Sequence, residues 1–274
     1  IVKNEECKMS NKPNIIFITS DQQRADCYGF AGRNIQTPHL DKLANTGTRF
    51  DSCITPNLVC QPSRASILTG QLPFTHGVCD NGIDLKPEVA EQGFAEQLNK
   101  VGYKTSFIGK AHFATSSTFQ PTGTPECKHS SKKFGSEWYG PYMGFKHVEL
   151  MTLGHWYKEK GPTLPPNGQH FERFVFEEAG SPEIFDIWHK EAKPGYGAAQ
   201  TWHSSLPVAL HSSTWCGDRA ISYLNNQTEN EPFCSWISFP DPHHPFDCPT
   251  PWSTMYNLDD VDLPTEGNKD LDNR

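Results

Sequence analysis

Residues 13–21 read PNIIFITSD, a run of apolar and β-branched side chains that ends abruptly in polar ones. Such a run is typical of a strand that is buried on both faces of a parallel sheet. Asp21 would then lie at the carboxyl end of this strand, the edge where open α/β sheets bind their ligands. The stretch therefore predicts a parallel sheet with a carboxylate at its functional edge.

Helix and strand patterns alternate along the rest of the chain. A crossover helix, a second strand and a short helix are predicted at residues 37–50, 51–55 and 62–70. Two helix-to-strand units follow, one within residues 93–113 and one formed by a helix at 213–226 and a strand at 233–239. The alternation predicts the α/β class, as an α/β/α sandwich with a mostly parallel central sheet.

The segment 120–210 is rich in Gly, Pro, Trp and His and has weak periodicity. We expect it to form a loop-rich insertion over the sheet edge, and such segments usually determine substrate specificity. Residues 1–12 are expected to form a tail, and the polar residues 258–274 predict no closing strand or helix.

The composition describes an ordinary acidic globular protein of 274 residues, with a net charge of -8 and 20% charged residues. This balance argues against nucleic acid as a partner. Nine scattered cysteines without a CxxC pair favour reduced thiols in a cytoplasmic protein over a disulfide scaffold or zinc module. The apolar run Ile15–Ile18 is too short for a membrane span or signal core, so no membrane partner is expected. A signal removed before residue 1 would instead place the protein in the periplasm or outside the cell.

Cys60 precedes Gln61 and Pro62, and its side chain would lie at the start of the short helix. Backbone N–H groups and the helix dipole favour an anion at such a position, and Arg64 follows one turn later. Taken alone, however, a cysteine of this kind is more often a buried structural residue.

Further candidates follow the other predicted strands. Lys110 and His112 stand two residues apart and can share one face, although a solvated loop pair is the commoner explanation of such residues. His243 lies in the stretch PDPHHPF, and a histidine can move protons near neutral pH. Asp21 could equally be a capping residue. Asn81 is a weaker candidate for the pocket wall.

Two stretches carry a resemblance to a known family. CQPSRASILTG, residues 60–70, resembles the signature of the type I sulfatases, and GYKTSFIGKAHF, residues 102–113, is similar to their second signature. Further similar segments extend the resemblance over about residues 13 to 250. The resemblance implies an alkaline-phosphatase-like fold.

The resemblance also implies a mechanism. In type I sulfatases the signature cysteine becomes formylglycine, and one hydroxyl of the hydrated aldehyde attacks sulfur. Cys60 would be the precursor, matured by a formylglycine-generating or an anaerobic sulfatase-maturating enzyme. Arg64 would hold the nucleophile, Lys110 would bind sulfate oxygens and assist His112, and His243 would be the general acid or a sulfate-binding residue.

A divalent cation is implied as well. Its ligands would include Asp21, Gln22 and the modified Cys60, with Ca²⁺ expected and Mg²⁺ or Mn²⁺ as alternatives. The family usually has Asp-Asp where this chain has Asp21-Gln22. The amide oxygen of Gln22 can still bind a cation, but the change lowers the charge of the site by one.

The family completes this metal site with a later Asp followed by Asn or His, and it adds a downstream Lys. No segment of the sequence matches these features. We therefore expect residues 1–274 to be the N-terminal part of a sulfatase catalytic domain, incomplete at its C-terminal end and inactive alone.

The implied function is hydrolysis of a small-molecule or carbohydrate sulfate ester to an alcohol and inorganic sulfate. A phosphonate or phosphate ester hydrolase of the same superfamily is the first alternative. Ser63, Lys110 and His112 favour the sulfatase, because the resemblance to phosphonate monoester hydrolases is weaker at these positions. A non-catalytic pseudo-sulfatase is the second alternative, suggested by Gln22 and the missing ligands.

Overall fold

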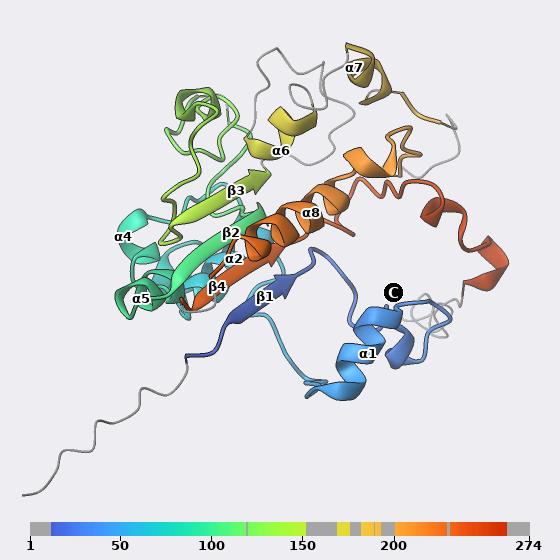
Figure 1. Ribbon diagram of the computed structural model, residues 1–274, viewed down its shortest axis with the longest axis horizontal. Helices are drawn as coiled ribbons and strands as arrows, with labels where there is room; N and C mark the ends of the chain where they lie inside the picture. The colour runs from blue at the N-terminus through green and yellow to red at the C-terminus, as the bar shows by residue number, and fades with distance from the viewer. Residues whose placement is uncertain are drawn as a thin grey trace, which may run out of the picture.

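The computed structural model describes residues 12–118, 120–151, 169–175, 182–188, 190–192, 201–228 and 231–261. Within these residues the centre is a sheet of four parallel strands in the order β1-β4-β2-β3 (Figure 1). The strands are β1 (Ile15–Thr19), β2 (Lys104–Lys110), β3 (His147–Met151) and β4 (Phe233–Ser238).

Helices cover both faces of the sheet, which confirms the predicted α/β/α sandwich. One face carries α2 (Cys60–Thr69), α4 (Pro87–Ala90) and α5 (Phe94–Lys100). The other carries α6 (His170–Arg173), α7 (Pro182–Trp188) and α8 (Ser212–Asn225). Short helices elsewhere are α1 (Pro38–Thr46), α3 (Pro73–His76) and the 3-10 turns Gly29–Ala31, Ser131–Phe134, Val208–Leu210, Trp252–Thr254 and Leu258–Asp260.

Two hydrophobic cores fill the space between the sheet and these helices. Neighbouring residues of a strand point to opposite faces. Phe107 and Trp236 accordingly pack into the core beneath α2 and α5, whereas Ile108 and Ile237 pack beneath α8. All six residues of the central strand β4 are buried. The strands are thus fixed in register, and their carboxyl ends meet at one edge.

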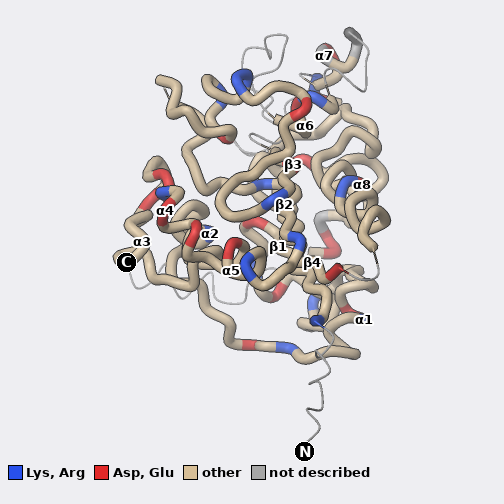
Figure 2. Tube along the Cα trace, turned by 60° about the vertical axis from the view of Figure 1, so that its left-hand side comes forward, with Lys and Arg blue, Asp and Glu red and all other residues tan. Residues whose placement is uncertain are grey.

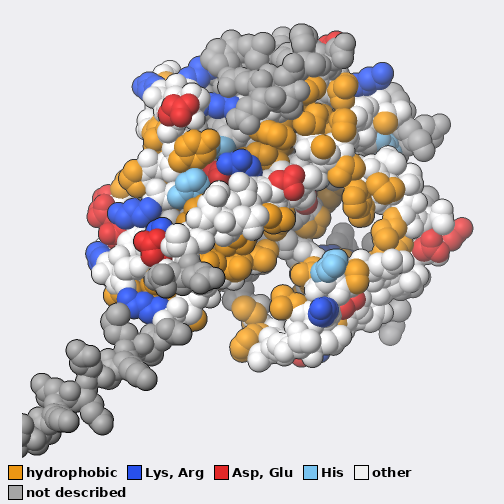
Figure 3. All heavy atoms as spheres, in the orientation of Figure 1, with side chains coloured by type: hydrophobic (Ala, Val, Ile, Leu, Met, Phe, Trp, Pro, Cys, Tyr) orange, Lys and Arg blue, Asp and Glu red, His pale blue; other side chains and the backbone are white. Residues whose placement is uncertain are grey.

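The prediction that β1 is buried on both faces is wrong. Phe17 packs 5.1 Å from Trp236 between ring centroids, but Ile16 and Ile18 on the opposite face are 50% and 58% exposed. The reason is topological, because β1 is an edge strand and α8 packs on β2 and β4. Figure 3 shows hydrophobic side chains reaching the surface on this side of the molecule.

Residues 51–55 do not form the predicted second strand. The segment begins with a turn, and its one large apolar side chain, Ile54, is 88% exposed. Residues 38–46 are helical as expected, but α1 does not cross over the sheet, and none of its residues is buried. It packs instead on the turn before it, where Asp41 Oδ1 accepts the Phe30 N–H at 3.0 Å. Figure 1 shows α1 away from the sheet.

The predicted insertion 120–210 contains a strand of the sheet. β3 pairs with β2 in parallel, and its Glu149 is buried between His147 and Arg219 of α8. The sequence pattern does not predict this strand because it is short and contains the charged residue Glu149. The residue that neutralises Glu149, Arg219, is distant in sequence. Residues 152–168 and several shorter parts of the insertion lie outside the described residues, as do most of the predicted tail and residues 262–274.

Charged positions of both signs are scattered along the described chain (Figure 2). Within the part of the chain that the structure describes, the helices are too short or too polar to span a membrane.

Candidate active site

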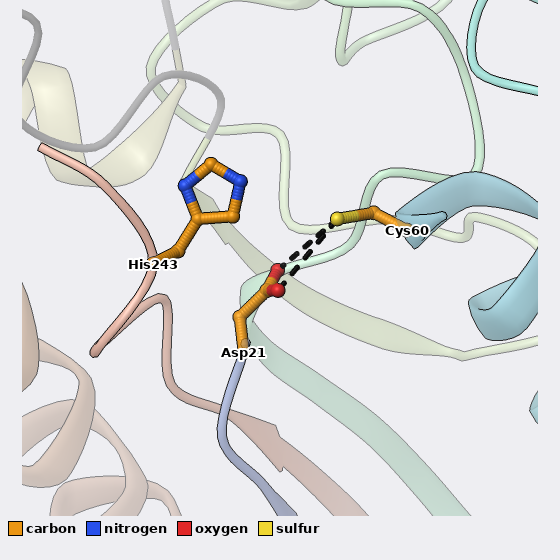
Figure 4. A group of neighbouring side chains, drawn as sticks. All are labelled: Asp21, Cys60 and His243. Carbon is orange, nitrogen blue, oxygen red and sulfur yellow. Dashed lines mark hydrogen bonds between the residues drawn. The ribbon is translucent and has the colours of Figure 1, made fainter. Parts of the chain in front are cut away.

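Four elements bring predicted site residues together at the carboxyl edge of the sheet. Asp21 follows β1, Cys60 is the first residue of α2, Lys110 ends β2, and His243 lies in the loop after β4. Figure 4 shows the Cys60 side chain pointing at the Asp21 carboxylate, with the His243 ring beside them. The convergence arises because parallel strands deliver their C-terminal residues to the same edge.

Asp21 is the centre of the charge arrangement. Its Oδ2 lies 2.6 Å from Lys110 Nζ and 3.1 Å from Arg64 Nη2. Burial would raise the pKa of Asp21, but the charges of Arg64 and Lys110 outweigh it and hold the pKa well below its usual range. Asp21 is therefore an ionised carboxylate at every physiological pH, and two positively charged side chains lie beside it.

Arg64 is held by groups on two strands. Its Nη1 donates to the Lys110 carbonyl at 2.6 Å and to Ser238 Oγ at 2.8 Å. The Ser238 hydroxyl in turn donates to the Lys110 carbonyl at 2.7 Å. These bonds fix the guanidinium, so Arg64 presents its remaining N–H groups in one orientation. Sequence patterns do not single out Ser238, although a serine at the end of a buried strand is a weak signal.

The start of α2 is fixed by side chains that follow in the sequence. Asn81 Oδ1 accepts the Gln61 N–H at 3.0 Å, and the buried Gln61 side chain accepts the Gly82 N–H at 2.5 Å. Asn81 therefore satisfies one of the free N–H groups at the helix start. It supports the position of Cys60, and this contact explains Asn81 without a role in a pocket wall.

The Cys60 thiol faces a carboxylate. Cys60 Sγ lies 3.6 Å and 3.7 Å from the two oxygens of Asp21. Burial raises the pKa of Cys60, although Lys110 acts in the opposite direction. An attacking cysteine needs a lowered pKa. The arrangement is therefore unsuited to a thiolate nucleophile at neutral pH.

His112 has an unusual backbone and an unpartnered nitrogen. Its φ of 52° lies in the left-handed region, which non-glycine residues seldom adopt. Its buried Nδ1 has no hydrogen-bond partner within the described residues. Burial, reinforced by the charges of Lys110 and Arg64, lowers the pKa of His112 to about 3. The ring is thus neutral near physiological pH.

His243 is held by its own loop. Its Nδ1 lies 2.5 Å from the His244 carbonyl oxygen, so this nitrogen carries a proton and Nε2 remains an acceptor in the neutral ring. Burial and the nearby charge of Lys110 lower the pKa of His243. A bound anion would oppose the effect of Lys110 and favour proton uptake.

The side chains at the predicted metal site offer ligand atoms of different kinds. Asp21, Cys60 and His243 have ligand atoms within 4.8 Å of one another. The Asp21 carboxylate suits a hard cation, whereas the thiol and the imidazole suit softer metals. Gln22 is exposed, and His244 Nδ1 lies 3.3 Å from its Oε1. The described residues therefore fit a cation such as Ca²⁺ through Asp21.

Two cavities flank this arrangement. One, of about 410 Å³, is lined by Asp21, Gln22, Cys60, Ser63 and Arg64 among others. The other, of about 490 Å³, has His243 on its wall. Its other lining residues are mostly apolar or ionisable: Val208, His211, Ser213, Thr214, Asp241, Pro242, Pro245, Phe246, Asp247, Cys248, Pro249 and Trp252. Both are large enough for part of an organic ligand.

The parallel sheet with helices on both faces has the alkaline-phosphatase-like fold of the solved structures described below. The sulfatase family model matches residues 13–273, and the chain belongs to the sulfatase family. The resemblance drawn from the two signatures is thereby confirmed. The roles predicted for the individual site residues remain predictions.

Two curated relatives illustrate the similarity. An N-acetylglucosamine-6-O-sulfatase of Bacteroides thetaiotaomicron is 28% identical over 88% of this chain and 32% of its own length. An arylsulfatase of Clostridium perfringens is 29% identical over 94% of this chain and 49% of its own. The chain thus spans about half or less of the length of these relatives.

Solved structures agree with the fold. A protein in complex with its substrate D-glucosamine-2-N,6-O-disulfate matches with a TM-score of 0.52 and 26% identity, over 85% of this chain and 35% of that one. The phosphonate monoester hydrolase of Agrobacterium radiobacter matches with a TM-score of 0.67 over 92% of this chain and 45% of that one. At 24% identity this second likeness concerns the fold alone.

Proposed function

We propose that this chain carries the nucleophile and sulfate-binding residues of a sulfatase that hydrolyses a sulfate ester to an alcohol and inorganic sulfate. The observation that carries the proposal is the position of Cys60 at the start of α2, facing Asp21 with Lys110 2.6 Å from the same carboxylate. Family membership supports the reaction class.

The nucleophile we propose is formylglycine made from Cys60. The raised pKa of the thiol disfavours Cys60 itself as nucleophile. In the hydrated aldehyde, one hydroxyl oxygen bonds to sulfur while the bond from sulfur to the ester oxygen breaks. The second hydroxyl then loses its proton, the carbon–oxygen bond to sulfate breaks, and the aldehyde re-forms. Water adds to the aldehyde and restores the hydrate.

The charged residues would bind the sulfate group. Lys110 and Arg64 bring two positive charges against one carboxylate, so the pocket has an excess of positive charge for an anionic ester. His112, a neutral imidazole close to the charges of Lys110 and Asp21, would assist proton removal from the second hydroxyl. His243 would protonate the leaving alcohol after anion binding has raised its pKa.

A Ca²⁺ ion is the cation we propose, held by Asp21, Gln22 and the oxygen that replaces the Cys60 sulfur. When bound, it would supply a fixed positive charge that stabilises the developing negative charge on oxygen. Metal analysis of the purified protein, by inductively coupled plasma mass spectrometry, would distinguish Ca²⁺ from Mg²⁺ and Mn²⁺.

A sulfated carbohydrate is the substrate class we propose. Relatives include an N-acetylglucosamine-6-O-sulfatase and an ulvan-active sulfatase of Formosa agariphila. The cavity beside His243 supports this choice, because Phe246 and Trp252 offer ring faces while Asp241 and Asp247 offer acceptors for hydroxyl groups. A Trp252→Ala variant should raise KM for sulfated sugars more than for a small aryl sulfate.

Co-expression with a formylglycine-generating enzyme tests the proposal. Mass spectrometry of the peptide that contains Cys60 should show formylglycine, and aryl sulfate should be hydrolysed. Cys60→Ala should abolish turnover, whereas Cys53→Ala, at an exposed cysteine, should retain it. Unmodified cysteine with undiminished activity in Cys60→Ala would refute the mechanism.

The phosphonate hydrolase alternative is tested with the same samples. Its supporting observation is a relative of Trinickia caryophylli, a multifunctional alkaline phosphatase superfamily protein that is 29% identical over 92% of this chain. Faster turnover of a phenyl phosphonate ester than of the aryl sulfate would favour it. No turnover of either ester by the matured protein, together with unmeasurable binding of a sulfate ester, would favour the pseudo-sulfatase.

The cytoplasm is the location we propose. Eight of the cysteines are described, and all eight are free thiols. Free thiols persist in reducing compartments. Fractionation of the native cells tests the location, and recovery in the periplasm or the medium would overturn it.

A further inference from the structure

Glu126 is a buried carboxyl group that the proposed mechanism does not use. Glu126 is only 3% exposed. A glutamate is rarely buried unless its side chain is paired. Glu126 Oε1 accepts the Phe113 N–H at 3.0 Å, the Ala114 N–H at 3.1 Å and the Tyr142 hydroxyl at 2.8 Å. One oxygen thus binds two consecutive backbone N–H groups directly after His112.

The backbone after His112 is fixed at several further points. The Phe113 carbonyl accepts the Leu85 N–H at 2.8 Å, and Asp84 Oδ1 accepts the Thr115 N–H at 2.7 Å. The Phe113 ring packs 5.6 Å from Phe107 between centroids. On the other side of His112, the Lys110 carbonyl is bound by Arg64 and Ser238. His112 therefore lies between two anchored segments.

His112 itself depends on these anchors. Its left-handed φ of 52° costs on the order of 1 kcal/mol. Its Nδ1 has no hydrogen-bond partner in the described structure, so that nitrogen does not hold the ring in place. The backbone conformation of His112 sets the direction in which its side chain leaves the chain.

We propose that Glu126 is a positioning residue, whose bonds to the Phe113 and Ala114 N–H groups hold His112 in its left-handed conformation next to Lys110. The proposal rests on the proposed function for its kinetic consequence. The structural part, the control of the His112 conformation, stands independently.

Position rather than charge is the property that matters. Burial raises the pKa of Glu126 to about 7, so a large fraction of the side chain is protonated and uncharged near neutral pH. A neutral glutamine of the same length retains an acceptor oxygen at the same place. An aspartate retains the charge but withdraws the oxygen by one methylene. The two variants separate the two properties.

The test compares Glu126→Gln, Glu126→Asp and Glu126→Ala in the matured protein. We expect kcat within a few-fold of wild type for Gln, about 10-fold lower for Asp and about 100-fold lower for Ala, with KM little changed, because a displaced catalytic group loses rate at this scale. Glu149→Gln is the matched control, since Glu149 is equally buried but pairs with Arg219 at β3. It should lower Tm without changing kcat.

A measurement that does not depend on enzymatic turnover tests the proposal even if the protein is inactive or the Glu126→Ala variant fails to fold. In NMR spectra of protein with ring-labelled histidine, the His112 signal should shift in Glu126→Asp and stay close to its wild-type position in Glu126→Gln. The signal that disappears in His112→Gln identifies His112. Hydrogen exchange at the Phe113 and Ala114 amides should accelerate in Glu126→Asp but not in Glu126→Gln. An unmoved His112 signal in Asp, or kcat that falls further in Gln than in Asp, overturns the proposal. Absence of turnover in wild type with the expected NMR shift contradicts the proposed function alone.

Discussion

The Asp21 carboxylate and the Lys110 ammonium lie 2.6 Å apart although their strands are not neighbours in the sheet. β4 runs between β1 and β2, and its Ser238 supplies the hydroxyl that binds Arg64. The charge arrangement thus spans three strands and α2. Its geometry depends on the register of the whole sheet rather than on one loop.

Loss of the Lys110 charge should damage the site selectively. Lys110→Ala leaves Asp21 paired with Arg64 alone and removes a charge that would bind sulfate, so kcat/KM should fall about 100-fold or more. Lys104→Ala is the control at the other end of β2, where Lys104 pairs with exposed Glu231. It should change kcat/KM little. Equal losses in steady-state assays of the two variants would contradict the role of Lys110.

Unmodified Cys60 should alkylate slowly. Its pKa is raised by burial and by the Asp21 charge, so a smaller fraction is thiolate at pH 8 than in an exposed cysteine. Asp21→Asn removes that negative charge and should accelerate alkylation of Cys60 by iodoacetamide. Peptide mass spectrometry follows the rate, and Cys79 in the same sample is the exposed reference. A slower reaction of Cys60 in Asp21→Asn would show that the carboxylate does not suppress the thiolate.

A methyl group at Gly109 should disrupt the sheet. Its Cβ would lie 2.0 Å from the Ser238 carbonyl oxygen, and its φ of 110° is unfavourable for other residues. Gly109→Ala should therefore lower Tm by many degrees. Gly217→Ala in α8 has open space around the new methyl and should stabilise the helix by roughly 0.5 to 1 kcal/mol. Thermal unfolding of both variants checks the contrast, which an unchanged Tm in Gly109→Ala would refute.

Glu126 should make stability depend on pH. Its folded pKa of about 7 lies above the ordinary value of 4.5, so folding favours the protonated group. Between these values the unfolded chain releases the proton first, and the free energy of unfolding falls as pH rises. The stabilisation is complete below pH 4.5 and lost above about pH 7.

Glu126→Gln should remove this dependence. Urea unfolding at pH 5 and pH 7.5 should show that wild type loses more stability than the variant, by roughly 3 kcal/mol at most. Other groups titrate in both proteins, so the difference between the two isolates Glu126. Parallel pH profiles for the two proteins would mean that the folded carboxyl group ionises normally.

Sequence patterns predicted the parts of this molecule that depend on local order. Strands β2 and β4, helix α5 and helix α8 have clear periodicity and clear ends, and the signatures drew attention to Cys60 and Lys110. The patterns missed β3 because its Glu149 is neutralised by a residue from α8. They missed Ser238 and Glu126 because each bonds to groups in other segments of the chain. They assigned β1 two buried faces because a single strand cannot reveal that it lies at an edge.

The central place of β4 has a consequence for biosynthesis. Arg64 and Ser238, which bond in the finished site, are 174 residues apart in the chain. At about 5–20 residues per second, roughly 10 to 35 seconds pass between their synthesis. During that interval the sheet lacks the strand that lies between β1 and β2, so the site at their carboxyl ends is incomplete. Under the proposed function, the late arrival of β4 would give a maturation enzyme time to modify Cys60 before the site is complete.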